Sequence, residues 1–344
     1  MNYELFSTFG LSKIIKTMEQ QDKMRLMKPR SYRMILVKGF QLYLGNFRRL
    51  LKASWLTALI YALFCGALGT VTAIQLPKLT TAIMQQAASG LPLTPELSQF
   101  YLMTAGAILL LALLSTAALA VASGTLLNKL KEHKETDAIS VPEKWLKPSM
   151  ALTLRTVKGV FMTLGITLLP CLLLALLVGG LERMMPETAA NHSVTFTVTT
   201  LALLAVILLF ALPLMHVLMK YVLEPPCRYW SVVRPAYKRG LRHMGLIVPV
   251  FFISLLLTSI VGLVVTMPSQ ILYLANQEAH LGLLIGDELG MPSYITPLTF
   301  FTVTACSLLG FYVGQLTLLH CYYLYGSIES RVAEESNTDN QVTT

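Results

Sequence analysis

The sequence predicts an all-α fold: a bundle of six transmembrane helices, accompanied by interfacial helices on the cytoplasmic surface. Two observations carry this prediction. The 344 residues are 54% hydrophobic and only 13% charged, whereas a soluble domain carries about 25% charged residues. The hydrophobic residues also gather in six long blocks, none of which contains Asp, Glu, Lys or Arg. Together they exclude an ordinary water-soluble domain.

Each block has the length that a membrane helix needs. About 20 apolar residues cross roughly 30 Å of hydrocarbon as an α-helix, which satisfies its own backbone hydrogen bonds in lipid. We therefore expect one membrane domain over 54–325. A basic, amphipathic segment over 1–53 precedes it, and a disordered cytoplasmic tail over 326–344 follows. The predicted spans are 54–76, 99–123, 159–181, 195–219, 245–274 and 297–325.

Positive charge is unevenly divided between the two sides of the predicted bundle. Of the 27 Lys and Arg residues, only Lys78 and Arg183 fall in loops on one of the two sides. Loops rich in Lys and Arg remain in the cytoplasm. We therefore expect a multi-pass protein of the bacterial inner membrane with its N-terminus and C-terminus cytoplasmic. The five cysteines lie in spans or on the cytoplasmic side, away from compartments where disulfides form.

Prolines mark where predicted helices bend or stop. Pro170 lies in the middle of the third span, Pro213 in the fourth, and Pro249 and Pro268 near the ends of the fifth. Membrane helices tolerate Pro with a kink, which serves either as packing geometry or as a hinge. Glu224 is followed by two prolines. Because a residue before Pro is disfavoured in the helical conformation, we expect the fourth helix to stop there.

The six spans pair into three hairpins, each preceded by a basic segment. The segments 43–49 and 237–243 share a starting Tyr and several cations, reading Tyr-Leu-Gly-Asn-Phe-Arg-Arg and Tyr-Lys-Arg-Gly-Leu-Arg-His. A threefold repeat of segment plus hairpin would explain the likeness. Orientation explains it equally well, because positive charge must precede each odd-numbered helix. Both explanations stay open.

The basic segment before the fifth span is a candidate lipid-binding surface. Arg234, Lys238 and Arg242 fall on one helical face at a spacing of four residues. Aromatic rings favour the membrane interface and cations favour anionic headgroups, so we expect Tyr229, Trp230 and Tyr237 on the membrane side and a helix that begins at Pro235. The alternative is that these cations only set the orientation of the chain.

Small residues recur at every fourth position in five of the spans. Such a stripe lets helix backbones approach closely, and its hydroxyls can form hydrogen bonds between helices. Gly66, Gly262, Gly310 and Gly314 belong to these stripes, and we predict that they are helix-packing positions. The alternative is a narrow polar lining made of Ser and Thr hydroxyls.

Three polar residues fall at membrane depth: His216, Gln315 and His320. Polar groups at this depth are candidates for function, although both histidines lie close enough to the cytoplasmic ends to reach the interface. The sequence contains no H-E-x-x-H zinc motif, P-loop, dinucleotide glycine pattern or G-x-S-x-G elbow. We therefore expect no enzyme activity and no cofactor or metal.

Several short segments resemble known membrane proteins. They are the stretch His-Cys-Tyr-Tyr-Leu-Tyr-Gly-Ser-Ile-Glu over 320–329, the Gly-Met-Pro loop over 290–292, and Phe-Arg-Arg-Leu-Leu-Lys over 47–52. They resemble multi-pass membrane proteins of the Bacteroides group to which no activity is assigned. The six helices preceded by basic segments are more loosely similar to the membrane domains of glycerophosphodiester phosphodiesterases. The phosphodiesterase domain itself is missing, so the resemblance implies no active site.

These observations favour a non-enzymatic membrane protein that interacts with membrane lipids, anionic ones in particular, or with partner proteins in a homo- or hetero-oligomer. Nucleic acid is not an expected partner. The alternative is a transporter or channel for a neutral or weakly polar solute. Coupled transporters place ionisable groups or broken helices near the midplane. The charge-free spans therefore disfavour ion-coupled transport and leave facilitated diffusion open.

Overall fold

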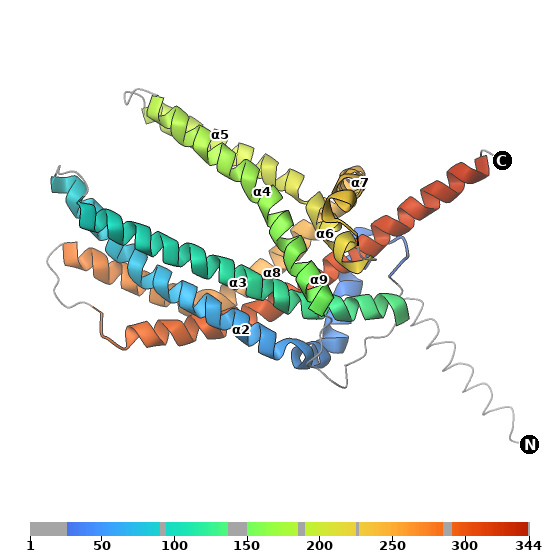
Figure 1. Cartoon of the computed structure of the whole chain (residues 1–344), viewed down its shortest axis with the longest axis horizontal. Coiled ribbons are helices and arrows are strands. Elements are labelled where there is room, and N and C mark those ends of the chain that lie inside the picture. The colour runs from blue at the N-terminus through green and yellow to red at the C-terminus, as the bar shows by residue number, and fades with distance from the viewer. Residues whose placement is uncertain are drawn as a thin grey trace, which may run out of the picture. The chain divides into compact units, whose positions relative to one another are not determined.

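A computed structural model describes residues 26–89, 94–136, 150–184, 190–224, 227–284 and 291–342. These residues form eight α-helices and no β-strand (Figure 1). Six helical stretches are long and apolar enough to cross a membrane. The predicted fold class, an all-α bundle of membrane-spanning helices, is therefore confirmed.

The helices run well beyond the predicted spans. For example, the first helix begins at Tyr32 and continues into the span expected to begin at residue 54. The fourth predicted span is divided between two helices. The helices are α2 (Tyr32–Ser89), α3 (Pro95–Thr136), α4 (Met150–Met184), α5 (Ala190–Ala211), α6 (Pro213–Leu223), α7 (Tyr229–Arg242), α8 (Met244–Leu284) and α9 (Ile295–Val342).

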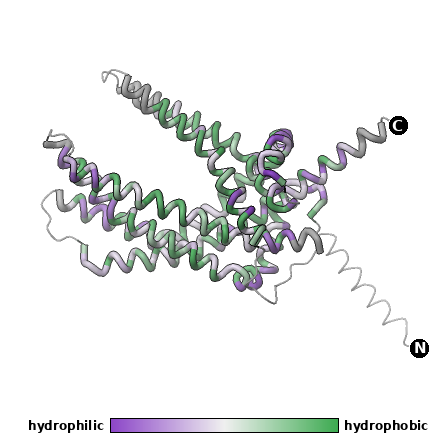
Figure 2. The backbone as a smooth tube through the Cα atoms, viewed as in Figure 1, coloured by the Kyte–Doolittle hydropathy of each residue, from purple (hydrophilic) through white to green (hydrophobic). Residues whose placement is uncertain are grey.

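Large apolar side chains lie on the outside of these helices. Figure 2 shows hydrophobic residues along most of the length of the long helices. On α4, Leu169, Leu172 and Leu176 are each more than half exposed. Water-soluble monomers rarely expose apolar surface this continuously, whereas hydrocarbon is a favourable environment for leucine. The exposed faces identify the chain as a multi-pass membrane protein.

The chain divides into two compact units. One unit comprises residues 1–47, 127–254 and 318–344, and we call it the α4–α7 unit because it contains those four helices. The other comprises residues 48–126 and 255–317 and is called the four-helix unit, because α2, α3, α8 and α9 each contribute a segment to it.

Close packing of α2 on α9 organises the four-helix unit. A Cβ added at Gly66 would collide with the side chain of Thr304 and approach the carbonyl of Phe300, and one added at Gly69 would meet Val303. Ala58 is fully buried in a small core with Ala122 and Phe311. The predicted role of Gly66 as a packing position is therefore confirmed.

The other three candidate packing glycines do not pack within the described part of the chain. A Cβ added at Gly262, Gly310 or Gly314 would meet no described atom within 4 Å outside its own helix. The described residues therefore provide no packing partner for these three predicted positions. Small residues permit close approach, but they supply no apolar area or hydrogen bond that forces a particular neighbour into place.

The α4–α7 unit contains a kink in the fourth span. α5 ends at Ala211, and Pro213 is the first residue of α6. Proline is suited to the first position of a helix, where its missing N–H removes no hydrogen bond. The carbonyl of Phe210, in the last turn of α5, accepts a hydrogen bond from the hydroxyl of Tyr237 (2.9 Å). Leu212, between the two helices, keeps helical backbone dihedrals, so the fourth span has the kink expected at Pro213, and α7 holds it.

α6 ends as the sequence predicts, whereas α7 begins earlier than predicted. α6 stops at Leu223, and Glu224 has extended backbone before the two prolines. α7 begins at Tyr229 rather than at Pro235, which lies inside the helix. The Pro removes one backbone hydrogen bond. Burial of Tyr229, Val232 and Ala236 along one face of α7 offsets this loss.

The end of the chain is also more ordered than the sequence predicts. α9 continues without interruption to Val342, and each residue from Leu319 to Ile328 is buried. The prediction of a disordered tail starting at residue 326 was therefore wrong. Ser327 and Glu329 in this stretch form hydrogen bonds and ion pairs within the protein, whereas residues 333–336 are exposed.

Candidate functional site

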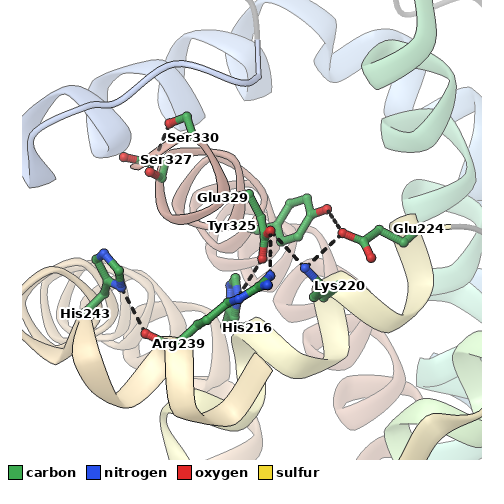
Figure 3. Close-up of polar contacts among 9 residues, drawn as sticks. All are labelled: His216, Lys220, Glu224, Arg239, His243, Tyr325, Ser327, Glu329 and Ser330. Atoms are coloured by element: carbon green, nitrogen blue, oxygen red, sulfur yellow. Dashed lines mark hydrogen bonds and ion pairs between the residues drawn. The ribbon is translucent and has the colours of Figure 1, made fainter. Parts of the chain in front are cut away.

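An ion cluster centred on Glu329 of α9 lies in the α4–α7 unit (Figure 3). Its carboxylate is 2.8 Å from Nζ of Lys220, 3.2 Å from Nε2 of His216 and 3.2 Å from a guanidinium nitrogen of Arg239. His216 and Lys220 project from α6, and Arg239 from α7. Because the carboxylate is only 13% exposed, these contacts compensate for the water it has lost.

A second carboxylate extends the cluster toward the end of α6. Lys220 also lies 3.2 Å from the carboxylate of Glu224, one helical turn away. The hydroxyl of Tyr325 donates a hydrogen bond to the same carboxylate (3.1 Å). The carboxylates of Glu224 and Glu329 thus balance the side-chain charges of Lys220 and Arg239. This balance explains how so much charge can be held in a mostly buried site.

Arg155 of α4 holds the segment after α6 in place. One guanidinium nitrogen donates to the carbonyl of Glu224 (2.8 Å), and the same guanidinium lies over the ring of Tyr221 at 4.5 Å from its centroid. Tyr221 in turn makes an edge contact with Tyr229 of α7, whose hydroxyl shares a 2.8 Å hydrogen bond with Thr163. α4, α6 and α7 are therefore joined by hydrogen-bonded aromatic residues.

The N-terminal residues of the described chain are fixed to α9 on the other side of that helix. The hydroxyl of Ser327 accepts a hydrogen bond from the N–H of Arg30 (2.9 Å) and donates to the carbonyl of the same residue (3.2 Å). Arg331 donates to this carbonyl as well (2.9 Å). Burial lowers the pKa of the Arg30 guanidinium, which lies over the ring of Tyr323. α9 is thus held by polar contacts on two faces.

All three candidate polar residues are buried. His216 takes part in the Glu329 cluster, and its ring does not reach solvent. His320 shares a 2.7 Å hydrogen bond with the hydroxyl of Ser254. Gln315 belongs to the four-helix unit and is 6% exposed. The structure therefore places the two histidines in separate hydrogen-bonded environments rather than in one shared site.

The face of α7 opposite its buried side carries the candidate lipid-binding cations. Arg234, Lys238 and Arg242 are all exposed. Arg242 lies 3.5 Å from the exposed carboxylate of Glu335. Arg234 and Lys238 form no ion pair with any residue that the structure describes. α7 therefore divides its cations: Arg239 joins the buried cluster, and Arg234 and Lys238 face outward.

The aromatic residues of α7 do not share a single membrane-facing side. Tyr229 is 2% exposed and packs inside the protein, contrary to the prediction. Trp230 is 65% exposed and lies four residues before Arg234 on the same face. Tyr237 is half-buried because its hydroxyl reaches Phe210. Only Trp230 therefore has the exposure expected of an interfacial ring.

Sequence reasoning missed the partners of His216. The sequence patterns indicated a helix stop at Glu224 and placed Glu329 only in a resemblance, and none of them singled out Lys220. Two spacings could have revealed the cluster: His216 and Lys220 lie four residues apart, as do Tyr325 and Glu329. Such spacing places both members of each pair on one helical face. The described residues contain no group of three or more His, Cys, Asp or Glu that could hold a metal ion.

No protein-family model matches the chain, and neither a curated protein nor a solved structure shows a significant match to it. Function is therefore argued from the geometry of the α4–α7 unit.

Proposed function

We propose that the chain is a non-enzymatic, multi-pass protein of the bacterial inner membrane that binds anionic lipid at its cytoplasmic face. The observation that carries the proposal is the outer face of α7, where Trp230, Arg234 and Lys238 are exposed together on a helix fixed to the protein body. Each cation close to an anionic membrane surface contributes about 1 kcal/mol to binding. A Trp ring beside them favours the depth of the headgroups.

The fixed position of α7 supports a binding surface rather than a loose basic segment. Gly240 of α7 lies so close to Pro213 that an added Cβ would be 2.9 Å from the proline ring. Arg239 is held by Glu329, and Tyr237 by the carbonyl of Phe210. The backbone of α7 is therefore ordered before a lipid headgroup contacts the exposed cations, so binding loses little backbone entropy.

The hydroxyls in the small-residue stripes favour lipid binding over a polar pathway. Thr70, Thr167 and Thr266 each donate to the carbonyl four residues earlier in their own helix. Ser54 and Thr116 do the same. Donors that are already used within a helix give a passing solute fewer groups to replace its water. The stripes are therefore weak support for transport of a neutral solute.

The proposal is tested by melting the protein in nanodiscs with and without phosphatidylglycerol. The variant Arg234→Gln/Lys238→Gln removes the two outward cations and leaves the Glu329 cluster intact. We expect anionic lipid to raise the melting temperature of the wild type more than that of the variant. Added salt should reduce this difference, because exposed charges are screened over about 10 Å at 0.1 M.

The matched control is Arg48→Gln/Lys52→Gln, which removes two exposed cations of α2. If phosphatidylglycerol raises the melting temperature of this control and of the α7 variant by equal amounts, both smaller than for the wild type, the cations act only through total charge. In that case the assignment of a binding surface to α7 fails.

The cytoplasmic position of α7 is tested by thiol labelling. Cys227 is exposed in the connection between α6 and α7. In intact cells, a membrane-impermeant maleimide should not label Cys227, but should label a cysteine introduced at Gly90. After permeabilisation both positions should react. The reverse pattern in intact cells would place α7 outside and overturn the topology.

A further inference from the structure

An apolar crevice of about 340 Å³ lies where α4, α5, α6 and α7 meet. Its walls include Ile166 and Pro170 of α4, Val206 and Phe210 of α5, and Val233 of α7. In Figure 1, α4 and α5 form a hairpin, and its open end, away from the connecting loop, lies next to α6 and α7. The crevice therefore belongs to a single unit and is bounded by several helices.

The crevice lies at the kink in the fourth span. Phe210 and Ala211 end α5, and Leu214 lies in the first turn of α6; all three line the crevice. Pro170 faces the same space from the middle of α4. Prolines in facing helices prevent the regular side-by-side packing that would close such a gap.

The two polar residues in the crevice wall have already used their hydroxyl hydrogens. Thr167 donates to the carbonyl of Thr163 (3.0 Å), and Tyr237 donates to the carbonyl of Phe210 (2.9 Å). Among the residues that the structure describes, no charged one lines the crevice. Its interior is therefore suited to a hydrocarbon rather than to a polar solute.

α7 joins the crevice to the exposed cations. Val233 and Tyr237 line the crevice, and Arg234 and Lys238 follow each of them directly in the sequence. Successive residues are about 100° apart around a helix axis. The side of α7 that faces the crevice is therefore adjacent, around the helix axis, to the outer face that carries Trp230 and Arg234. A molecule with an apolar chain and a negative head could contact both.

We propose that the crevice holds one acyl chain of an anionic phospholipid whose headgroup is bound by Arg234 and Lys238. This inference rests on the proposed function and identifies its ligand as a retained lipid rather than the bulk membrane surface. The volume lies at the lower end of the range of about 300–1,000 Å³ for small-molecule sites. It therefore accommodates part of one chain, with the second chain in the surrounding bilayer.

Native mass spectrometry in mild detergent tests this inference. The protein is exchanged into equimolar dioleoyl phosphatidylglycerol and dioleoyl phosphatidylcholine, and the retained lipids are counted. Wild-type protein should retain phosphatidylglycerol preferentially. The variant Val206→Trp places an indole in the crevice and should lower retention of either lipid roughly tenfold, which is about 1.4 kcal/mol. Leu208→Trp is the control, because Leu208 is equally exposed on α5 but does not line the crevice.

The variant Arg234→Gln/Lys238→Gln separates the two proposals. It should remove the preference for phosphatidylglycerol. If it does so while Val206→Trp retains lipid as the wild type does, the crevice inference is overturned and headgroup binding stands. If the double variant keeps the preference, the proposed function fails, and the inference fails with it.

Photo-cross-linking of a lipid to the wild-type protein tests the inference without relying on variants, which could misfold. Phosphatidylglycerol with a diazirine on one acyl chain should cross-link to peptides of α4, α5 and α7 that line the crevice. Cross-links spread evenly over the exposed leucines of α4, such as Leu169 and Leu176, would show an ordinary lipid annulus and contradict the inference.

Discussion

Two stretches of the same helix, α9, differ in how continuously they are buried. In the stretch 302–314, Gly310 and Gly314 belong to a stripe of small residues that the sequence indicates as a packing face. An added Cβ at either position nevertheless meets no described atom within 4 Å outside its own helix. In the stretch 319–328, which reaches into the predicted disordered tail, every residue is buried.

The difference lies in what each kind of residue requires from its neighbours. A glycine permits another helix to approach but loses nothing if none does. Buried hydroxyls and carboxylates lose free energy unless they find hydrogen-bonding partners. Tyr322 donates to the carbonyl of Leu130 (3.1 Å), Tyr325 to Glu224, and Ser327 to Arg30. Residues that need partners therefore specify the packing of α9 better than residues that only tolerate them.

The largest effect is expected from Glu329→Gln. The change removes the carboxylate between His216, Lys220 and Arg239 and leaves the cations close together with less compensation. Removing one partner of a buried ion pair destabilises a protein by about 3–5 kcal/mol. We expect a loss of this size in the free energy of unfolding, measured by denaturant titration in detergent.

Glu335→Gln is the control for this experiment. Glu335 is about half exposed and lies 3.5 Å from Arg242. Exposed pairs of this kind contribute at most about 1 kcal/mol. Equal losses for the two variants would show that the burial of α9 around Glu329 has no energetic consequence.

Glycine-to-leucine substitutions test the other stretch of the helix. Gly66→Leu should destabilise the protein, because its side chain would collide with Thr304 of α9. Overpacking of this kind reduces stability by about 1–3 kcal/mol or more. Gly310→Leu should leave the melting temperature in detergent nearly unchanged, since nothing described lies near its Cβ. If Gly310→Leu lowers the melting temperature as much as Gly66→Leu does, Gly310 contacts another chain. The stretch 302–314 would then be a packing face after all.

The fold class was predictable from the sequence because the membrane imposes a simple requirement. A helix that crosses hydrocarbon needs about 20 apolar residues, and the six charge-free blocks meet that requirement directly. The kink at Pro213 and the end of α6 before the two prolines were also expected, because Pro restricts the backbone locally. Local chemistry is sufficient for these features.

The Glu329 cluster was not predictable in the same way. Its carboxylate is more than a hundred residues from His216 and Lys220 in the sequence, and one sequence does not show which helices meet. The start of α7 was misplaced for a similar reason. Pro235 predicts a helix start by local rules, but packing of Tyr229 against Tyr221 extends the helix in the N-terminal direction. Tertiary contacts outweigh local preference at both sites.

Gly326→Ala examines the buried stretch with the smallest possible change. An added Cβ there would collide with the carbonyl and side chain of Leu26, so the N-terminal segment must shift. We expect a loss of about 1–3 kcal/mol in the free energy of unfolding, as for other overpacked sites. Limited proteolysis should also cleave the segment around residues 26–31 faster than in the wild type. An unchanged stability would mean that this segment does not depend on its contact with α9.

Gly314→Ala is the matched change in the open stretch, and its effect should be smaller and opposite in sign. Glycine inside a helix is less favourable than alanine by about 0.5–1 kcal/mol, because the flexible glycine backbone loses more entropy on folding. Gly314 is exposed, and an added methyl group would meet no described neighbour. The substitution should therefore raise the free energy of unfolding by roughly that amount, measured by denaturant titration in the same detergent as Gly326→Ala. If both alanines destabilise the protein, the two stretches of α9 are equally packed and the contrast between them fails. If only Gly326→Ala does so, side chains that need hydrogen-bonding partners, rather than small residues at a spacing of four, determine where this helix is buried.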